Sequence, residues 1–134
     1  MTELGAFLHA AGNRRREPGV WDCACMPADW ARANGYPDPM AARRGGYSTD
    51  DEAHAFIAEA GGLVALFDDY LVRVGIFRRE GPPQPGDIGA LSIAGVEGGA
   101  IFTGERWALV AERGLVFTRA NDDMVMAVWA VAHG

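Results

Sequence analysis

The chain has few of the residues that disulfide frameworks and metal centres require. Its 134 residues include two cysteines and three histidines, and the cysteines stand together as Cys23-Ala24-Cys25. Side chains two positions apart point in different directions in a helix or a strand, so a bridge between these two would be strained. A tetrahedral metal site would need a second Cys or His pair nearby. We therefore expect reduced thiols, no metal and no cofactor.

Long apolar runs and clusters of basic residues are also missing. No run of about 18 apolar residues is present that could span a membrane, and the first residues lack the basic start and apolar core of a secretory signal. Lys and Arg number 12 against 18 Asp and Glu, so the net charge is −6. This balance disfavours binding to nucleic acid or to anionic membranes. The one basic run, Arg14-Arg15-Arg16, is either a solvated loop or a docking patch for an acidic partner.

The hydrophobic pattern places helices first and strands second. Apolar spacing and capping signals predict four helices, at 2–12, at about 24–34, from the Thr49–Glu52 capping box to Gly61-Gly62, and from 63 to 75. Short β-rich runs follow the turn-rich segment 81–86, at 88–93, 100–103, 107–111, 115–118 and 124–132. We expect a single α+β domain over residues 1–134, with the helices packed on an antiparallel meander of about five strands.

The segment that most strongly suggests a catalytic role is Asp22-Cys23, directly before the second predicted helix. A thiol at a helix N-terminus is more easily ionised, because the exposed N–H groups and the helix dipole favour the thiolate. Pro27, however, lacks the N–H that would bond the Cys23 carbonyl. The regular helix would then begin nearer Ala24–Met26 and leave Cys23 outside it. Three interpretations of the two cysteines remain open. Both could serve as small buried apolar side chains or as weakly reactive thiols, and Cys23 alone is also a candidate for a working nucleophile.

Other chemically suggestive residues each have a structural alternative. The two acidic pairs, Asp50-Asp51 and Asp122-Asp123, could be catalytic carboxylates, but a helix N-terminus and a turn explain them. Gly98-Gly99 either lets another backbone approach closely or is a simple turn. Each of the four tryptophans stands beside apolar neighbours in the sequence, so they are expected to be either core anchors or a sugar-binding platform. They are Trp21, Trp30, Trp107 and Trp129.

The order of these features resembles the NlpC-type cell-wall peptidases, papain-like cysteine hydrolases that cut peptidoglycan stem peptides. In that family an Asp-Cys pair starts a helix and a Gly-Asp pair opens the first strand, as Asp22-Cys23 and Gly86-Asp87 do here. A narrower resemblance, over about residues 20–131, is to short proteins of phage and prophage tail-gene clusters. It rests on five motifs in order: Trp21-Asp22-Cys23, Ala28-Asp29-Trp30, Tyr47-Ser48-Thr49, Gly61-Gly62-Leu63 and Gly86-Asp87-Ile88. The resemblance implies an NlpC-like fold with Cys23 as the candidate nucleophile.

One departure from the family concerns the catalytic histidine, which usually opens the second strand as His-Val-Gly-Ile. At that place this chain reads Glu97-Gly98-Gly99-Ala100-Ile101. The three histidines, His9, His54 and His133, fit surface or terminal positions, and none matches the motif. The resemblance therefore implies a degenerate peptidase fold that acts by protein–protein binding. Its partners would be other tail proteins of the tip or hub, in a virion tail or phage-like particle assembled from protein made in the bacterial cytoplasm.

Two alternatives remain open from the sequence. The first is an active cysteine endopeptidase or amidase that uses Cys23 to cut bacterial peptidoglycan during DNA entry. It needs a base from elsewhere, such as His133 folded back along the last strand or a histidine of a partner chain. The second is a host-side immunity or toxin-associated domain that keeps the same fold.

Overall fold

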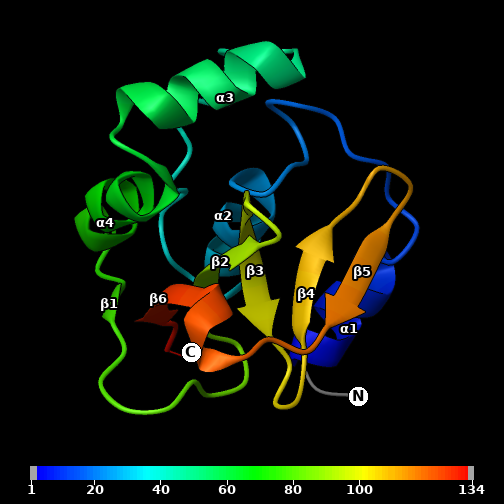
Figure 1. The fold of residues 1–134 in the computed structure, drawn as a ribbon, viewed down its shortest axis with the longest axis vertical. Helices are drawn as coiled ribbons and strands as arrows, with labels where there is room; N and C mark the ends of the chain where they lie inside the picture. Colours follow the sequence, from blue (N-terminus) through cyan, green and yellow to red (C-terminus); the bar gives the residue numbers. More distant parts are fainter. Residues whose placement is uncertain (1–2, 133–134) are drawn as a thin grey trace.

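The structure is a computed structural model and describes residues 3–132. Four helices come first: α1 (Glu3–Ala11), α2 (Cys25–Ala33), α3 (Asp50–Glu59) and α4 (Leu63–Arg73). Six strands follow: β1 (Phe77–Arg78), β2 (Ile88–Ile93), β3 (Val96–Phe102), β4 (Trp107–Val110), β5 (Leu115–Thr118) and β6 (Val125–Ala130), with the 3-10 turn η1 (Asp122–Met124) before β6. Figure 1 shows this order, which confirms the α+β class. Residue 2, the start of the first predicted helix, lies outside the described range.

The strands form one antiparallel sheet in the order β1-β6-β2-β3-β4-β5. Strands β2 to β5 are a meander, and β6 crosses back to pair with β2, where Ile88 is opposite Trp129. The sheet has one strand more than expected, because β1 is a two-residue strand beside β6. The segment 96–99, predicted as a turn, belongs instead to β3, where Gly98 is opposite Leu91.

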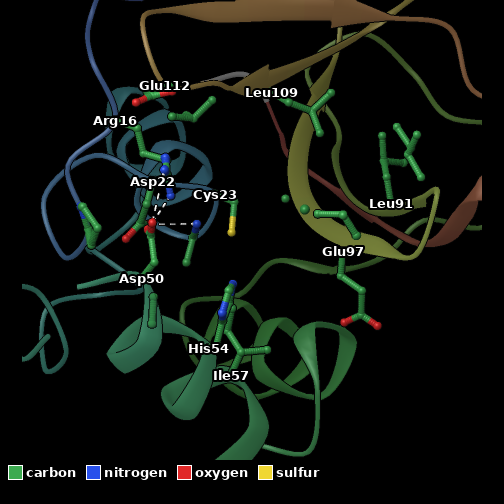
Figure 2. Close-up of a pocket in the computed structure, with 18 of the residues that line it drawn as sticks. Arg16, Asp22, Cys23, Asp50, His54, Ile57, Leu91, Glu97, Leu109 and Glu112 are labelled. Atoms are coloured by element: carbon green, nitrogen blue, oxygen red, sulfur yellow. Dashed lines mark hydrogen bonds and ion pairs between the residues drawn. The ribbon is translucent and has the colours of Figure 1, made fainter. Parts of the chain in front are cut away.

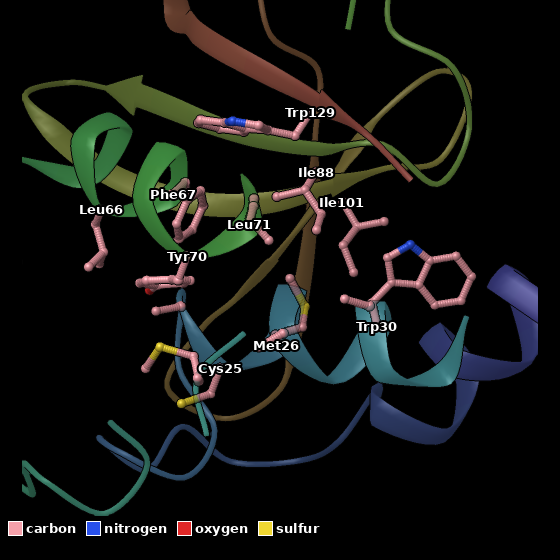
Figure 3. Close-up of a cluster of buried hydrophobic side chains, with 14 of the residues drawn as sticks. Cys25, Met26, Trp30, Leu66, Phe67, Tyr70, Leu71, Ile88, Ile101 and Trp129 are labelled. Atoms are coloured by element: carbon pink, nitrogen blue, oxygen red, sulfur yellow. The ribbon is translucent and has the colours of Figure 1, made fainter. Parts of the chain in front are cut away.

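The main core lies between one face of the sheet and helices α2 and α4 (Figure 3). Trp30 of α2 donates its indole N–H to the Gly86 carbonyl at 2.8 Å, and Trp129 of β6 packs edge-on against Phe67 of α4 with ring centroids 5.3 Å apart. A smaller cluster on the opposite face is centred on Trp107. None of the four tryptophans is more than 2% exposed, which confirms them as core anchors. None of the helices in the described range has the length and apolar character needed to span a bilayer.

Two helix starts position the site. Helix α3 begins at the predicted capping box, where the Thr49 hydroxyl accepts the backbone N–H of Glu52 at 3.1 Å. Helix α2 begins at Cys25, so that Pro27 lies in its first turn, where a missing N–H is tolerated. The expectation that this helix starts after Cys23 is therefore confirmed.

Candidate functional site

The buried carboxylate of Asp22 fixes the backbone around Cys23. It accepts the backbone N–H groups of Gly19 at 2.8 Å, Ala24 at 3.0 Å and Cys25 at 2.8 Å. The hydroxyl of Tyr47 donates a fourth hydrogen bond at 2.6 Å. These donors replace the water that a carboxylate loses on burial, and two of them are the free N–H groups at the start of α2. Asp22 thus binds the N–H groups at the start of α2, and Cys23 lines the adjoining cavity.

Cys23 is half-buried and lies two residues before α2. Burial, with a smaller contribution from the negative charge of Asp22, raises the pKa of its thiol from 9.0 to about 11, although the backbone N–H of Gly99 acts in the opposite direction. At pH 7 the thiolate fraction is therefore on the order of 10⁻⁴. Because Cys23 stands before the first turn of α2, the helix terminus does not offset this shift. In this environment the side chain is a protonated thiol.

Cys25 has a structural role. Its side chain is fully buried, and its sulfur lies 4.0 Å from the Tyr47 hydroxyl. Burial, followed by the charge of Asp22, raises the pKa of its thiol to about 12. Burial, followed by its hydrogen bond to Asp22 and the charge of that carboxylate, raises the pKa of Tyr47 well above its usual value. Both cysteines are free thiols, and Cys25 fits the interpretation as a small buried side chain.

Cys23 opens onto a cavity of about 520 Å³ between α3, the β2–β3 hairpin and the end of β4 (Figure 2). Its volume lies within the range of small-ligand pockets. The wall opposite Asp22 and Cys23 is largely apolar and includes Ile57 of α3, Leu91 of β2 and Leu109 of β4. The glycine pair Gly98-Gly99 forms the part of β3 that faces the cavity, so the wall is bare of side chains there.

The charged side chains around the cavity are mostly acidic. Arg16 is bound to the carboxylate of Asp50 at the start of α3 through both terminal guanidinium nitrogens. Glu97 and Glu112 also line the cavity, and they lie on opposite sides of it (Figure 2). The Glu97 carboxylate makes one long contact, 3.5 Å from the backbone N of Leu63. The cavity therefore combines an apolar wall with a negative rim.

The three histidines have different positions relative to Cys23. His9 is an exposed residue in the last turn of α1, and His133 lies outside the described residues. His54 is exposed on α3, as expected, but it also lines the cavity and points toward its interior (Figure 2). Within residues 3–132 no hydrogen bond joins its imidazole to the Cys23 sulfur. Nor does the described part of the chain contain three or more His, Cys, Asp or Glu side chains grouped to hold a metal ion.

The close approach of β3 to Cys23 explains Gly99. A Cβ at position 99 would lie 2.1 Å from the Cys23 carbonyl oxygen and 2.7 Å from the Phe67 ring. Only glycine fits there, which decides between the two interpretations of the glycine pair in favour of a close backbone approach. By the alternation of a strand, Glu97 is on the same side of β3 as Gly99. The Glu97 side chain extends from this side of β3 toward the start of α4, where its carboxylate lies 3.5 Å from the backbone N of Leu63 (Figure 2).

The comparison with known families gives one result. The family described as a domain of unknown function (DUF6950) matches residues 1–131. The chain belongs to this family. No curated protein and no solved structure matches it.

In this DUF6950 chain the Gly86-Asp87 pair has a structural role. Asp87 is fully buried, and its carboxylate accepts both Nε and a terminal nitrogen of Arg79 at 2.8 and 2.9 Å. The backbone N–H of Gln84 adds a third hydrogen bond at 2.9 Å. The pair holds the turn before β2 against the end of β1, so it shapes the sheet.

The basic run and the acidic pairs also have structural partners. Arg14 stacks over the Trp21 ring at 4.3 Å from its centroid, and Arg16 pairs with Asp50. Of the three arginines that could form a docking patch for an acidic partner, only the exposed Arg15 has no such contact within residues 3–132. Asp50-Asp51 form the first turn of α3 and Asp122-Asp123 the start of η1, as the helix-terminus and turn explanations require.

Proposed function

We propose that this chain is a structural or assembly component of a phage-like tail, in the tip or hub region, and that it acts by binding other tail proteins. The fold would be a degenerate form of the NlpC-like peptidase fold. The observation that carries the proposal is the state of Cys23. Its thiol pKa is about 11, and the segment where the resemblance expects the catalytic histidine, Glu97-Gly98-Gly99-Ala100-Ile101, contains no histidine.

A hydrolase of this type needs a base that takes the proton from its thiol. A carboxylate is a far weaker base than an imidazole, so it is a poor acceptor for the proton of a thiol whose pKa is about 11. The contacts of Asp22 and Gly99, by contrast, keep the backbone of the site in place. A site that keeps its architecture, but in which no imidazole within residues 3–132 is hydrogen-bonded to the thiol, supports binding over catalysis.

The proposal is tested by assembly. The chain is co-expressed with the proteins encoded by its neighbouring genes, which the proposal predicts to include tail-tip and hub proteins, and complexes are measured by size-exclusion chromatography with light scattering. We expect a stable complex with one of them, and the same dissociation constant for Cys23→Ala as for the wild-type chain. The proposal fails if none of these proteins binds, or if Cys23→Ala abolishes the complex while the variant remains folded.

A cysteine endopeptidase or amidase is the second candidate, and one observation favours it. His54 and Cys23 line the same cavity, so a movement of α3 could bring the imidazole to the sulfur. In that case an acyl-type, thiol-directed probe would label Cys23 at neutral pH, and peptidoglycan stem peptides would be cut. His54→Ala would abolish both reactions, whereas His9→Ala, on the exposed face of α1, would leave them unchanged. Absence of labelling in the wild-type chain, alone and with its tail partners, rejects this candidate.

A further inference from the structure

We propose that the Cys23 cavity binds an extended segment of a partner protein in which basic residues flank a large apolar residue. The inference rests on the proposed function, because it names the chemistry of the partner that a protein-binding module of this shape would take. It is carried by the shape of the cavity, by its apolar wall and by the arrangement of charges at its rim.

The apolar wall gives the cavity its central subsite. Ile57, Leu91 and Leu109 come from three different elements, and all three line the cavity. Gly98-Gly99 of β3 also lines the cavity and adds no side chain to this wall. A large aliphatic or aromatic side chain placed here would remove this wall from water, which is the main source of affinity in such pockets.

The rim charges select for cationic neighbours of that side chain. Glu112 has no ion pair to its carboxylate within residues 3–132, and Glu97 has only its long contact with the backbone of Leu63. Arg16, a lining residue of the opposite sign, is already bound to Asp50. Since Glu97 and Glu112 lie on opposite sides of the cavity, a ligand gains from both only if it carries positive charge at two separated points.

A segment of polypeptide fits this arrangement better than a small cation. The described residues group no three metal-ligating side chains, and Glu97 and Glu112 lie on opposite sides of the cavity (Figure 2). A point charge could approach one acid only and would leave the wall in contact with water. An extended chain places successive side chains in different directions and spans the cavity with both kinds of group. The negative rim and the net charge of −6 would repel an acidic segment.

The test uses synthetic peptides as probes and fluorescence anisotropy as the readout. Three labelled, end-blocked peptides share a Gly/Ser frame and carry Lys-Leu-Lys, Glu-Leu-Glu or Lys-Ser-Lys at the centre. We expect the first to bind, and the others to bind at least about tenfold more weakly, because each lacks one of the two interactions. Glu97→Gln and Glu112→Gln should each weaken binding of the Lys-Leu-Lys peptide by about three- to fivefold. Glu105→Gln removes an exposed acid outside the cavity and serves as the matched control, with no change expected.

The outcomes separate this inference from the proposed function. Equal binding of the three peptides, or an equal loss for Glu105→Gln and Glu97→Gln, overturns the inference. A complex with a tail protein that forms unchanged in the Glu97→Gln/Glu112→Gln double variant also overturns it, but leaves the proposed function standing. Selective binding of the Lys-Leu-Lys peptide without any complex with the neighbouring tail proteins supports the cavity chemistry and rejects the tail assignment.

Discussion

The contact between Gly99 and Cys23 offers the sharpest test of the geometry, because an adjacent glycine provides a matched control. A Cβ at position 99 would lie 2.1 Å from the Cys23 carbonyl oxygen. That distance is more than an ångström inside ordinary contact, and the obstacle is backbone that cannot rotate away. At position 98 a Cβ would meet only the tip of Leu109, at 3.3 Å. The variants Gly99→Ala and Gly98→Ala therefore add the same methyl group to neighbouring positions of one strand.

The expected difference in the free energy of unfolding follows from these contacts. Overpacking a well-filled site costs about 1–3 kcal/mol, and Gly99→Ala belongs at the upper end because both β3 and the segment before α2 must move. Gly98→Ala should raise the free energy of the folded state only slightly. Because alanine restricts the unfolded chain more than glycine does, this loss is offset by about 0.4–1 kcal/mol. We expect a loss of about 3 kcal/mol for Gly99→Ala and a change within about 1 kcal/mol for Gly98→Ala.

Equilibrium unfolding in urea, followed by tryptophan fluorescence and by circular dichroism, measures this difference. A loss of about 3 kcal/mol would remove a large share of the stability of a domain of this size. The reasoning is refuted if the two variants are equally stable, or if Gly98→Ala is the more damaging one. Either result would mean that β3 does not pass against the Cys23 carbonyl as described.

Two further pairs of variants test the buried polar contacts. Tyr47→Phe removes the hydroxyl that donates at 2.6 Å to the buried carboxylate before α2, and we expect a loss of about 2 kcal/mol in unfolding free energy. Its control, Tyr36→Phe, loses a hydrogen bond at an exposed backbone N–H and should lose less than about 1 kcal/mol. Arg79→Gln leaves the buried Asp87 unpaired and should lose about 3 kcal/mol. Its control, Arg78→Gln, breaks an exposed ion pair and should lose no more than about 1 kcal/mol. Urea unfolding measures the difference within each pair of variants. Equal losses within a pair would contradict the assignment of one contact as buried and the other as exposed.

Much of the fold could be predicted because its signals are local. The capping box at Thr49 sets the start of α3, and the β-rich runs 88–93 and 115–118 have the same bounds as β2 and β5. Pro27 likewise determines where α2 begins. In each case the residues that decide the structure lie within a few positions of one another, so the pattern contains the necessary information.

The errors in the fold have long-range causes. Segment 96–99 contains two glycines, which weaken a strand and indicate a turn. It is a strand because it pairs with β2, and the glycine at 99 is needed because this strand passes the carbonyl of Cys23, a residue 76 positions earlier in the chain. Strand β1 has two residues and exists through its pairing with β6. No periodicity can be read from so short a segment.

The cavity was harder to predict than the fold. The motif Asp22-Cys23 identified one wall, but helical periodicity alone does not tell which surface of α3 closes the other. His54 was expected at an exposed helical position, and the structure places that position over the cavity. In the sequence, Glu97 stands out only as the first residue of the segment that lacks the family's histidine. Its presence at the rim depends on the strand character of the segment that was predicted to be a turn.

The ionisation of Cys23 tests the central claim most directly. The rate of alkylation at Cys23 is measured against pH by mass spectrometry of the modified peptide. With a thiol pKa raised from 9.0 to about 11, the protonated form dominates until the pH approaches the raised value. We expect the rate to rise about tenfold per pH unit through pH 10 and to be about 100-fold below that of an ordinary cysteine at pH 8. A plateau below about pH 8 would show a thiolate ready for catalysis at neutral pH and would contradict the account of a binding module built on an inactive site.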